Sequence, residues 1–355
     1  MTIANTSSRS GLAALRTARI LLAAIVVALA FGPIALAANE LKLLTEFFCL
    51  LVIALMWNLL AGYADIVSVG QHAFVGIGAY AFYGFTVHLG LDPFAAIGMA
   101  GLVALAFAVP SLIVIFRLRA AYLAVGTWVL AEVLMLIAGK LPGFGGGSGV
   151  SLPVAVVREF GAQPAVRLAT IYWLSFGLAL FAFASTFLLM RSRIGLGLTA
   201  MRDNEEGAGA VGVDLIRTRV ICFLWTAPFL GLAGALITLQ KLRIAPPASF
   251  SITDWTVFVI FIVVIGGIGS FEGPVLGCIL YFVLREYLAG LGAWNLIILG
   301  SVSIAMIIVE PRGLWGIARR FLPGNVLETG YGGLSRREKK RAVEPGLAAD
   351  SHRIY

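Results

Sequence analysis

The chain has 355 residues, of which 60% are hydrophobic and only 12% charged, with a net charge of +8 and a mean hydropathy of +0.97. Soluble domains carry roughly 25% charged residues, so this composition excludes a water-soluble globular protein and predicts one that uses lipid as its solvent. The basic residues stand beside apolar runs, which favours a role in membrane orientation over binding of nucleic acid.

A helix needs about 20 apolar residues to cross a bilayer. This criterion predicts an all-α polytopic membrane protein with about ten transmembrane helices, of which the third, eighth and ninth are short or interrupted by glycine. In chain order they cover 19–38, 41–61, 67–88, 93–116, 120–138, 168–190, 218–240, 253–268, 273–290 and 293–310. The predicted organisation is a cytoplasmic N-terminal tail (1–18), a transmembrane domain (19–316) and a polar, basic cytoplasmic tail expected to be disordered (317–355).

The first predicted helix resembles a cleavable signal peptide, since three arginines precede its apolar run and residues 35–37 read Ala-Leu-Ala. We favour an uncleaved helix because the run is long enough to span and another span follows at once. Lys and Arg are enriched in cytoplasmic loops, which predicts that both termini lie inside. With that orientation the basic residues left outside are only Lys42, Lys140, Arg158, Arg167, Lys241, Arg243 and Arg285, out of 26.

The external loop 139–167 is the longest outer connection and is rich in glycine. It either closes over a pore mouth or is a flexible connector. No phosphate-binding loop and no hydrolase motif occurs in the chain, which predicts no enzymatic activity and no bound cofactor. Cys49, Cys222 and Cys278 lie far apart inside apolar runs and are interpreted as packing residues, with no metal site and no disulfide.

The cytoplasmic loop 190–217 contains a predicted short helix. Asn204 is a good N-cap, two glutamates occupy the first turn, Gly212 supplies a C-terminal stop and Asp214 can cap the next helix. A bare helix has little of its own to bury, so we interpret it as docking in a partner's groove, with an unbound surface helix as the alternative. The candidate coupling residues are Arg202, Asp203, Asn204, Glu205, Glu206, Gly209 and Gly212.

Two glycine-broken segments, 62–80 and 265–277, lie in opposite halves of the chain, as is typical of transporters with a midplane pathway. His72 is interpreted as a helix-packing hydrogen-bonding residue, with a proton relay as the alternative. Glu132, the one acid well inside a confident span, is expected either to face a water path or to make a helix-packing hydrogen bond. The candidate pathway residues are Ser68, Gly70, Gln71, His72, Phe74, Gly76, Gly78, Tyr80, Glu132, Gly266, Gly267, Gly269, Ser270, Gly273 and Pro274.

These motifs resemble those of the M-type permease subunit of branched-chain amino-acid (Liv-type) ABC importers. The family's loop, Arg-x-Asn-Glu-x-Ala-x-x-Ala-x-Gly, is matched from Arg202 to Gly212, with Gly207 where alanine is usual. Residues 227–236, 266–277 and 311–316 match three further motifs. The segment 62–80 matches in part, departing at Asp65 and Ile66 and shifting its histidine to His72. The resemblance covers roughly residues 41–316.

The resemblance implies a permease in the bacterial inner membrane that imports branched-chain amino acids delivered by a periplasmic binding protein. It also implies a companion H-type permease and two ABC ATPase subunits that use ATP and bind the coupling loop. Urea, short amides or aromatic acids are alternative solutes. An ion-coupled secondary transporter acting alone is the alternative class, and it is disfavoured because only Glu132 and His72 could bind a coupling ion.

Overall fold

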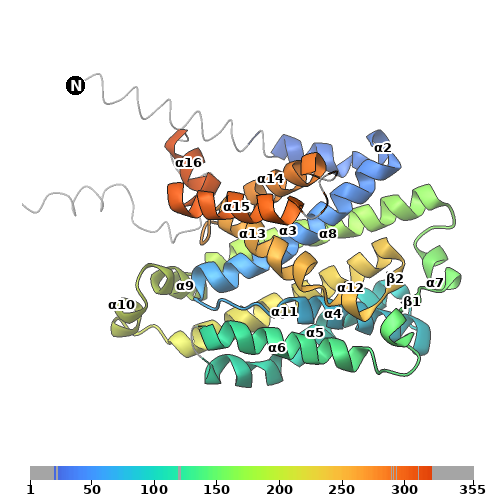
Figure 1. The fold of residues 1–355 in the computed structure, drawn as a ribbon, viewed down its shortest axis with the longest axis horizontal. Coiled ribbons are helices and arrows are strands. Elements are labelled where there is room, and N and C mark those ends of the chain that lie inside the picture. The colour runs from blue at the N-terminus through green and yellow to red at the C-terminus, as the bar shows by residue number, and fades with distance from the viewer. Residues whose placement is uncertain are drawn as a thin grey trace, which may run out of the picture.

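The computed structural model describes residues 20, 23–118, 121–288, 290, 292, 294–310 and 312–321. These residues form a helical bundle, with one pair of short antiparallel strands in which Val150 lies opposite Ile244 (Figure 1). The predicted N-terminal tail, the part of the predicted C-terminal tail after residue 321, and Pro311 lie outside the described residues.

Residues 23–30 are helical, and the elements that follow have these bounds: α2 Gly32–Ala35, α3 Ala38–Tyr63, α4 His72–Tyr83, η1 Gly84–His88, α5 Pro93–Arg117, α6 Ala121–Ala138, η2 Gly146–Ser148, β1 Val150–Ser151, α7 Val154–Glu159, α8 Pro164–Met190, α9 Arg193–Asp203, α10 Glu205–Ala210, α11 Leu215–Lys241, β2 Arg243–Ile244, α12 Pro246–Ser249, η3 Thr253–Val257, α13 Phe258–Gly266, α14 Gly273–Leu288, α15 Trp294–Val309 and α16 Gly313–Phe321. Both η1 and η3 are single π-helical turns, which continue directly into or out of an α-helix.

Six helical segments among the described residues are long and apolar enough to cross a membrane, namely α3, α5, α6, α8, α11 and the segment Pro246–Gly266. A seventh results if α15 and α16, bent by 47° at their junction, count as one span. The predicted multi-pass membrane class is therefore confirmed. The predicted helices at 67–88 and 273–290 are shorter than expected, since α4 begins only at His72 and α14 has 16 residues.

The centre of the bundle is formed by α3 and α11, against which α4, α5 and α8 pack. Every side chain from Phe48 to Leu60 is buried, as expected for a helix that is apolar on all sides. At the periphery α6 is the least buried of the six segments and presents large apolar side chains outward. Such a surface is stable where lipid or another membrane protein covers it.

The two ends of the bundle carry different structures. At one end α9 and α10 project beyond the long helices, while η2, the two strands and α7 lie at the opposite end (Figure 1). The loop predicted to be cytoplasmic and the loop predicted to be external are thus on opposite ends. Sequence reasoning did not predict α9, which begins where the Ser192 hydroxyl accepts hydrogen bonds from the amides of Ile194 and Gly195.

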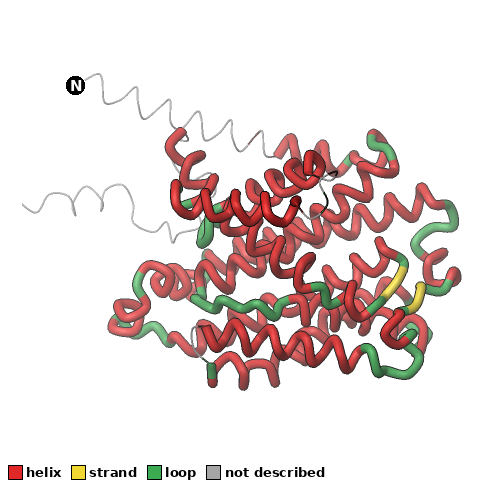
Figure 2. Tube along the Cα trace, in the orientation of Figure 1, coloured by secondary structure: helices red, strands yellow, loops and turns green. Residues whose placement is uncertain are grey.

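The segment 64–71 has no helical structure and runs from the α9 end into the middle of the bundle (Figure 2). The predicted interruption of the third span is therefore confirmed, and it occupies the first part of that span. The second glycine-rich segment is placed differently from the expectation. Residues 267–272 form a turn between α13 and α14 that contacts α9, so the turn lies at the end of the bundle and not at its middle.

Candidate functional site

The short helix α10 has the predicted ends. Its N-cap is Asn204, whose Oδ1 accepts a hydrogen bond from the Gly207 amide at 2.9 Å, and two glutamates fill the first turn. Gly212, with φ +90°, follows in the left-handed region that ends helices. The Asp214 carboxylate then caps α11 by accepting from the Arg217 amide at 2.9 Å. Local sequence alone accounts for this helix.

The outward surface at α10 consists of small residues with apolar side chains beside them. Ala208 is buried against the bundle, whereas Gly209 and Ala210 are exposed. Directly beyond the helix, the side chains of Val211 and Ile216 are 80% and 64% exposed. Exposed apolar side chains that lie together in this way are typical of surfaces that a partner covers, which is the use that the sequence predicts for this loop.

Arg202 points back into the bundle. Its Nη1 donates to the Gly269 carbonyl at 2.9 Å, and its Nε and Nη2 donate to Asp203 Oδ1 at 3.0 and 2.9 Å. The guanidinium carbon lies 5.3 Å from the centre of the Tyr63 ring. Two of the predicted coupling residues, Arg202 and Asp203, therefore contact each other, and Arg202 also contacts the second glycine-rich turn.

Arg219, in the first turns of α11, joins three groups. Its Nε donates to the Ala64 carbonyl at 3.0 Å, and its Nη2 lies 2.9 Å from Glu205 Oε2 and 3.7 Å from Asp65 Oδ2. Asp65 has φ +53°, in the left-handed region that residues with a side chain rarely adopt. The cation thus lies between the first turn of α10 and the start of the non-helical segment 64–71.

The backbone of segment 64–71 finds hydrogen-bond partners within the protein. The Trp57 indole donates to the Ser68 carbonyl at 2.9 Å, and the Val69 amide donates to Thr127 Oγ1 at 3.1 Å. The Ser68 hydroxyl accepts from the Gly70 amide at 3.2 Å. A side chain at Gly70 would collide with the Thr127 carbonyl. Non-helical backbone in the middle of the bundle is stable because these hydrogen-bonding groups replace the water that is absent there.

His72 and Gln71 connect the start of α4 to η3. The Thr256 hydroxyl donates its single hydrogen to the Val69 carbonyl at 3.2 Å, so His72 Nδ1, 2.9 Å from the same oxygen, carries a hydrogen and donates it. Gln71 Nε2 donates to the Trp255 carbonyl at 3.0 Å. Both side chains are buried, and His72 Nε2 and Gln71 Oε1 have no hydrogen-bond partner among the described residues, so the packing interpretation of His72 stays a prediction beside the proton relay.

Small residues on α4 allow close approach of its neighbours. A Cβ at Gly78 would overlap the Gly231 carbonyl of α11, and a Cβ at Gly234 would overlap the Val75 carbonyl. At Gly76 the added atom would enter the Phe250 ring. Gly76 and Gly78, both predicted pathway residues, thus allow close packing of helices, as small residues do in membranes. Phe74 does the same, with its ring edge-on to that of Phe223 at 5.6 Å.

The second glycine-rich turn is fixed by Asn58 of α3. Asn58 Oδ1 accepts from the Gly269 amide at 2.8 Å, and Nδ2 donates to the Ser270 carbonyl at 2.8 Å. Gly267 and Gly269 adopt φ +119° and +69°, and the Ser270 hydroxyl bonds the Gly267 carbonyl at 2.5 Å. Gly273 and Pro274 are buried at the start of α14, where Gly273 lies against Gly266 too closely for a side chain.

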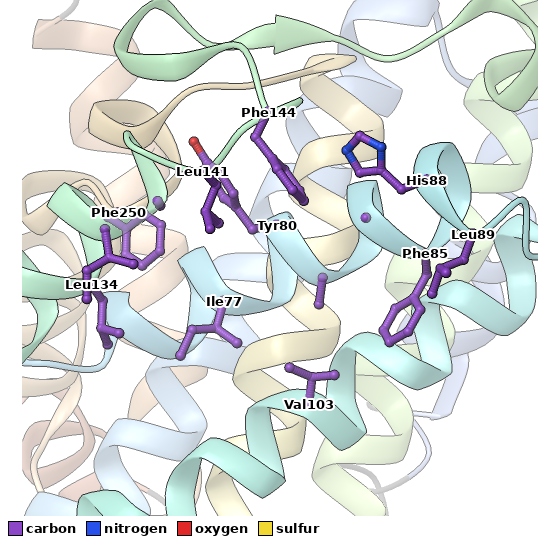
Figure 3. Close-up of a pocket in the computed structure, with 14 residues that line it drawn as sticks. Ile77, Tyr80, Phe85, His88, Leu89, Val103, Leu134, Leu141, Phe144 and Phe250 are labelled. Atoms are coloured by element: carbon purple, nitrogen blue, oxygen red, sulfur yellow. The ribbon is translucent and has the colours of Figure 1, made fainter.

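A pocket of about 460 Å³ lies toward the opposite end of α4, between α4, η1, α5, α6 and the external loop (Figure 3). Its walls are apolar, and include Ile77, Val103 and Leu134. Phe144 of the glycine-rich loop covers it and stacks on Tyr80 at 5.6 Å. Tyr80, a predicted pathway residue, lines the pocket, and its buried hydroxyl has no hydrogen-bond partner among the described residues.

Glu132 lies on α6, where its Oε1 accepts a hydrogen bond from the Trp128 indole at 3.0 Å. This bond joins two residues four apart on the same helix and is not a packing contact between helices, so both expectations for Glu132 stay predictions. The expectation that Glu132 is the one acid well inside a span is wrong. Glu46 lies inside α3 and pairs with Arg285 of α14 at 2.9 Å, which also places Arg285 within a helix of the bundle.

Sequence reasoning missed Asn58, Thr127, Arg219 and Thr256 as site residues. For Asn58 a signal existed, because a polar side chain inside a long apolar run is costly and therefore has a partner. The partners themselves lie far away in the sequence, so nothing local could identify them. The structure brings Arg202, Gly269, Glu205 and the start of segment 64–71 together. Tyr80 instead contacts Phe144 and Phe250, and Glu132 contacts Trp128.

Comparison with known proteins agrees with this architecture. The family described as branched-chain amino acid transport system / permease component matches residues 39–309. The high-affinity branched-chain amino acid transport system permease proteins LivM of Salmonella typhimurium and Escherichia coli are 27% and 26% identical over 321 residues, covering 84% of this chain and 75% of each relative. A probable branched-chain amino acid transport permease protein LivH of Methanocaldococcus jannaschii is 24% identical over 37% of this chain and 43% of its own length.

No solved structure is a significant match to the chain. The matched family region runs from the start of α3 to the end of α15 and contains both glycine-rich segments and the α9–α10 loop. The chain is a multi-pass membrane protein that belongs to the family of branched-chain amino acid transport system permease components of ABC transporters.

Proposed function

We propose that this chain is one of two membrane-spanning subunits of an ABC importer in the bacterial inner membrane. A companion H-type permease completes the pathway, a periplasmic binding protein delivers the solute, and two ATPase subunits supply the energy. The chain itself catalyses no reaction and binds no cofactor, since ATP is used by its partners. The names of its relatives support branched-chain amino acids as the solute.

The observation that carries this proposal is the exposed, capped helix α10 at one end of the bundle. It has small residues on its surface and exposed apolar side chains beside it, which is the form of a helix that fits a groove on another protein. The matching family is described as the permease component of a transport system, which supports the assignment of the energy source to separate subunits.

For topology we propose ten spans with both termini in the cytoplasm. The six long segments are then joined by four shorter proposed spans, at 19–38, 67–88, 273–290 and 293–310. Within these the described helical parts include 23–30, α4, α14 and α15. Lys and Arg support the orientation. Arg191, Arg193 and Arg217 lie in or directly beside the α9–α10 loop, which the rule for cytoplasmic loops assigns to the inside.

The pocket beneath Phe144 supports a solute with an apolar side chain, because its described lining is almost wholly aliphatic and aromatic. Urea and short amides fit such walls poorly. Aromatic acids fit them as well as aliphatic ones do, so they remain the second solute class to test.

The test is to place a charge on the proposed docking surface. Val211→Asp is expected to abolish co-purification of the ATPase subunits and ATP-driven leucine uptake in proteoliposomes. The matched control is Val154→Asp at the opposite end of the bundle, where the valine is 65% exposed, and it is expected to retain ATPase co-purification. Wild-type ATPase association of Val211→Asp would refute the docking role, and leucine uptake by this chain without any ATPase would replace it with a secondary transporter.

A further inference from the structure

Two arginines stand on either side of α10, one at the end of α9 and one near the start of α11. Arg202 donates to the Gly269 carbonyl, in the turn between α13 and α14. Arg219 donates to the Ala64 carbonyl, at the start of segment 64–71. Each non-helical segment is therefore bound through its backbone to one flank of the proposed docking helix.

The Arg219 side chain contacts both α10 and the non-helical segment 64–71. Its Nη2 lies 2.9 Å from Glu205, in the first turn of α10, and 3.7 Å from Asp65, whose backbone is left-handed. The Arg219 side chain is only 22% exposed, so the interaction with Glu205 is less screened by salt than one between fully exposed charges. A displacement of α10 consequently pulls on the residue at which α3 ends and the non-helical segment begins.

The Arg202 contact reaches the same region from the other side. Gly269, its acceptor, lies so close to the last turn of α3 that a Cβ at Gly62 would be 2.7 Å from the Gly269 Cα. The guanidinium also covers the Tyr63 ring. Both arginines thus act within a few residues of the C-terminal end of α3, where the two glycine-rich segments meet.

We infer that Arg202 and Arg219 are positioning residues that transmit movement of α10 to the two non-helical segments. Arg219 acts on 64–71 through Ala64 and Asp65, and Arg202 acts on 267–272 through Gly269. The inference rests on the proposed function, because the movement is supplied by an ATPase bound at α10. It gives the arginines a role distinct from docking, since their guanidinium groups face the bundle.

The experiment follows movement at three positions of the full complex by spin labelling. Single cysteines replace Leu196 of α9, which adjoins α10 without forming the proposed docking surface, Val67 in the first segment and Ile268 in the second; all three side chains are exposed, while the natural cysteines are buried and remain unlabelled. The complex is trapped with and without ATP and vanadate. In the wild-type chain all three labels are expected to change environment on ATP binding.

The decisive variants are Arg219→Gln and Arg202→Gln. Arg219→Gln is expected to reduce the ATP-dependent change at position 67 by about tenfold, within the range of coupling between linked sites, while the change at 196 persists. Arg202→Gln is expected to do the same at 268. The matched controls are Arg217→Gln and Arg193→Gln, which remove the same charge from exposed neighbours on the same helices.

Each outcome decides one claim. A label at 67 that responds normally in Arg219→Gln overturns the transmission role of Arg219, and one at 268 that responds normally in Arg202→Gln overturns that of Arg202. A label at 196 that does not respond to ATP in the wild-type complex overturns the proposed function instead. Should Arg219→Gln prevent assembly, Asp65→Asn serves in its place, because asparagine tolerates the left-handed backbone and loses only the charge. In Asp65→Asn the ATP-dependent change of the label at 67 is expected to be about threefold smaller than in the wild-type chain. A change of the wild-type size overturns the inference.

Discussion

Asn58 holds Gly269 by its backbone: the Asn58 side-chain oxygen accepts a hydrogen bond from the Gly269 amide at 2.8 Å. The same side chain donates to the neighbouring Ser270 carbonyl, so one amide group satisfies two main-chain groups of a turn 211 residues away in the sequence. Asn58 is 1% exposed and lies in α3, the most buried of the six long segments. The position of the second glycine-rich turn is therefore set from α3.

Replacing this side chain tests how much the turn depends on it. Asn58→Leu keeps a side chain of similar size but leaves the Gly269 amide and the Ser270 carbonyl without their partner. Since each unsatisfied buried group costs about 1–3 kcal/mol, we expect unfolding free energy in detergent to fall by about 2–5 kcal/mol. Thermal unfolding, monitored by tryptophan fluorescence, measures this loss of unfolding free energy. Gln240→Leu, which removes one exposed hydrogen bond to Lys42, is the control and is expected to change little; equal losses in both variants would contradict the assignment.

Glycine at position 78 is required by the distance between α4 and α11. Gly78→Ala is expected to lower the unfolding temperature severely or to prevent expression, because the added methyl group overlaps the Gly231 carbonyl and neither backbone has a flexible end that can move aside. Gly98→Ala in α5 is the matched control. No described atom lies within 4 Å of its added Cβ, and alanine favours helix by about 1 kcal/mol, so the unfolding temperature should stay level or rise. Fluorescence-detected size exclusion after heating distinguishes the two.

His72 provides the test between an ATP-driven and a proton-driven transporter. Thr256→Val leaves the His72 Nδ1 hydrogen and the Val69 carbonyl without the hydroxyl that joins them, and we expect a loss of about 1–3 kcal/mol in stability. A second measurement concerns transport. If His72 only packs helices together, it carries no protons, and ATP-driven leucine uptake by the wild-type complex should be unaffected by a protonophore. Uptake that collapses with the proton gradient while ATP is present would support the proton-relay interpretation.

Much of the architecture could be predicted from local sequence, for physical reasons visible at particular residues. The membrane class follows from long apolar runs, and the ends of α10 follow from Asn204 and Gly212, whose effects act within one turn of helix. The interruption before α4 was also predictable, since glycine and Ser68 break an apolar run. Its extent was not, because the Thr127 and Trp57 groups that stabilise extended backbone there come from other helices.

The predicted role of individual pathway residues depended on contacts that periodicity does not encode. Gly76 and Gly78 looked like parts of a broken helix and instead lie in a regular one, where they admit Phe250 and Gly231. Arg202 looked free for a partner because it stands in a loop rich in charge. The distant Gly269 carbonyl determines its direction, and only the folded chain brings the two together.

The hydroxyl of Tyr80 gives a prediction that separates stability from transport. This hydroxyl is buried and has no partner among the described residues, so Tyr80→Phe removes an unsatisfied group and is expected to leave stability unchanged or raise it by up to about 1 kcal/mol. Tyr172→Phe is the matched control: its hydroxyl, also on a buried tyrosine, donates to the Leu29 carbonyl at 2.6 Å, so we expect a loss of about 0.5–1.5 kcal/mol. Thermal unfolding of both variants measures this difference.

Transport gives the second half of the same comparison. If the pocket beneath Phe144 receives the solute, the Tyr80 hydroxyl gains its missing partner only when solute is present, and Tyr80→Phe raises the KM of leucine uptake several-fold without loss of stability. Tyr172 lies outside the pocket lining, so Tyr172→Phe should leave the KM unchanged. An unaltered KM in Tyr80→Phe would mean that the solute passes elsewhere and that the pocket is filled by apolar groups alone.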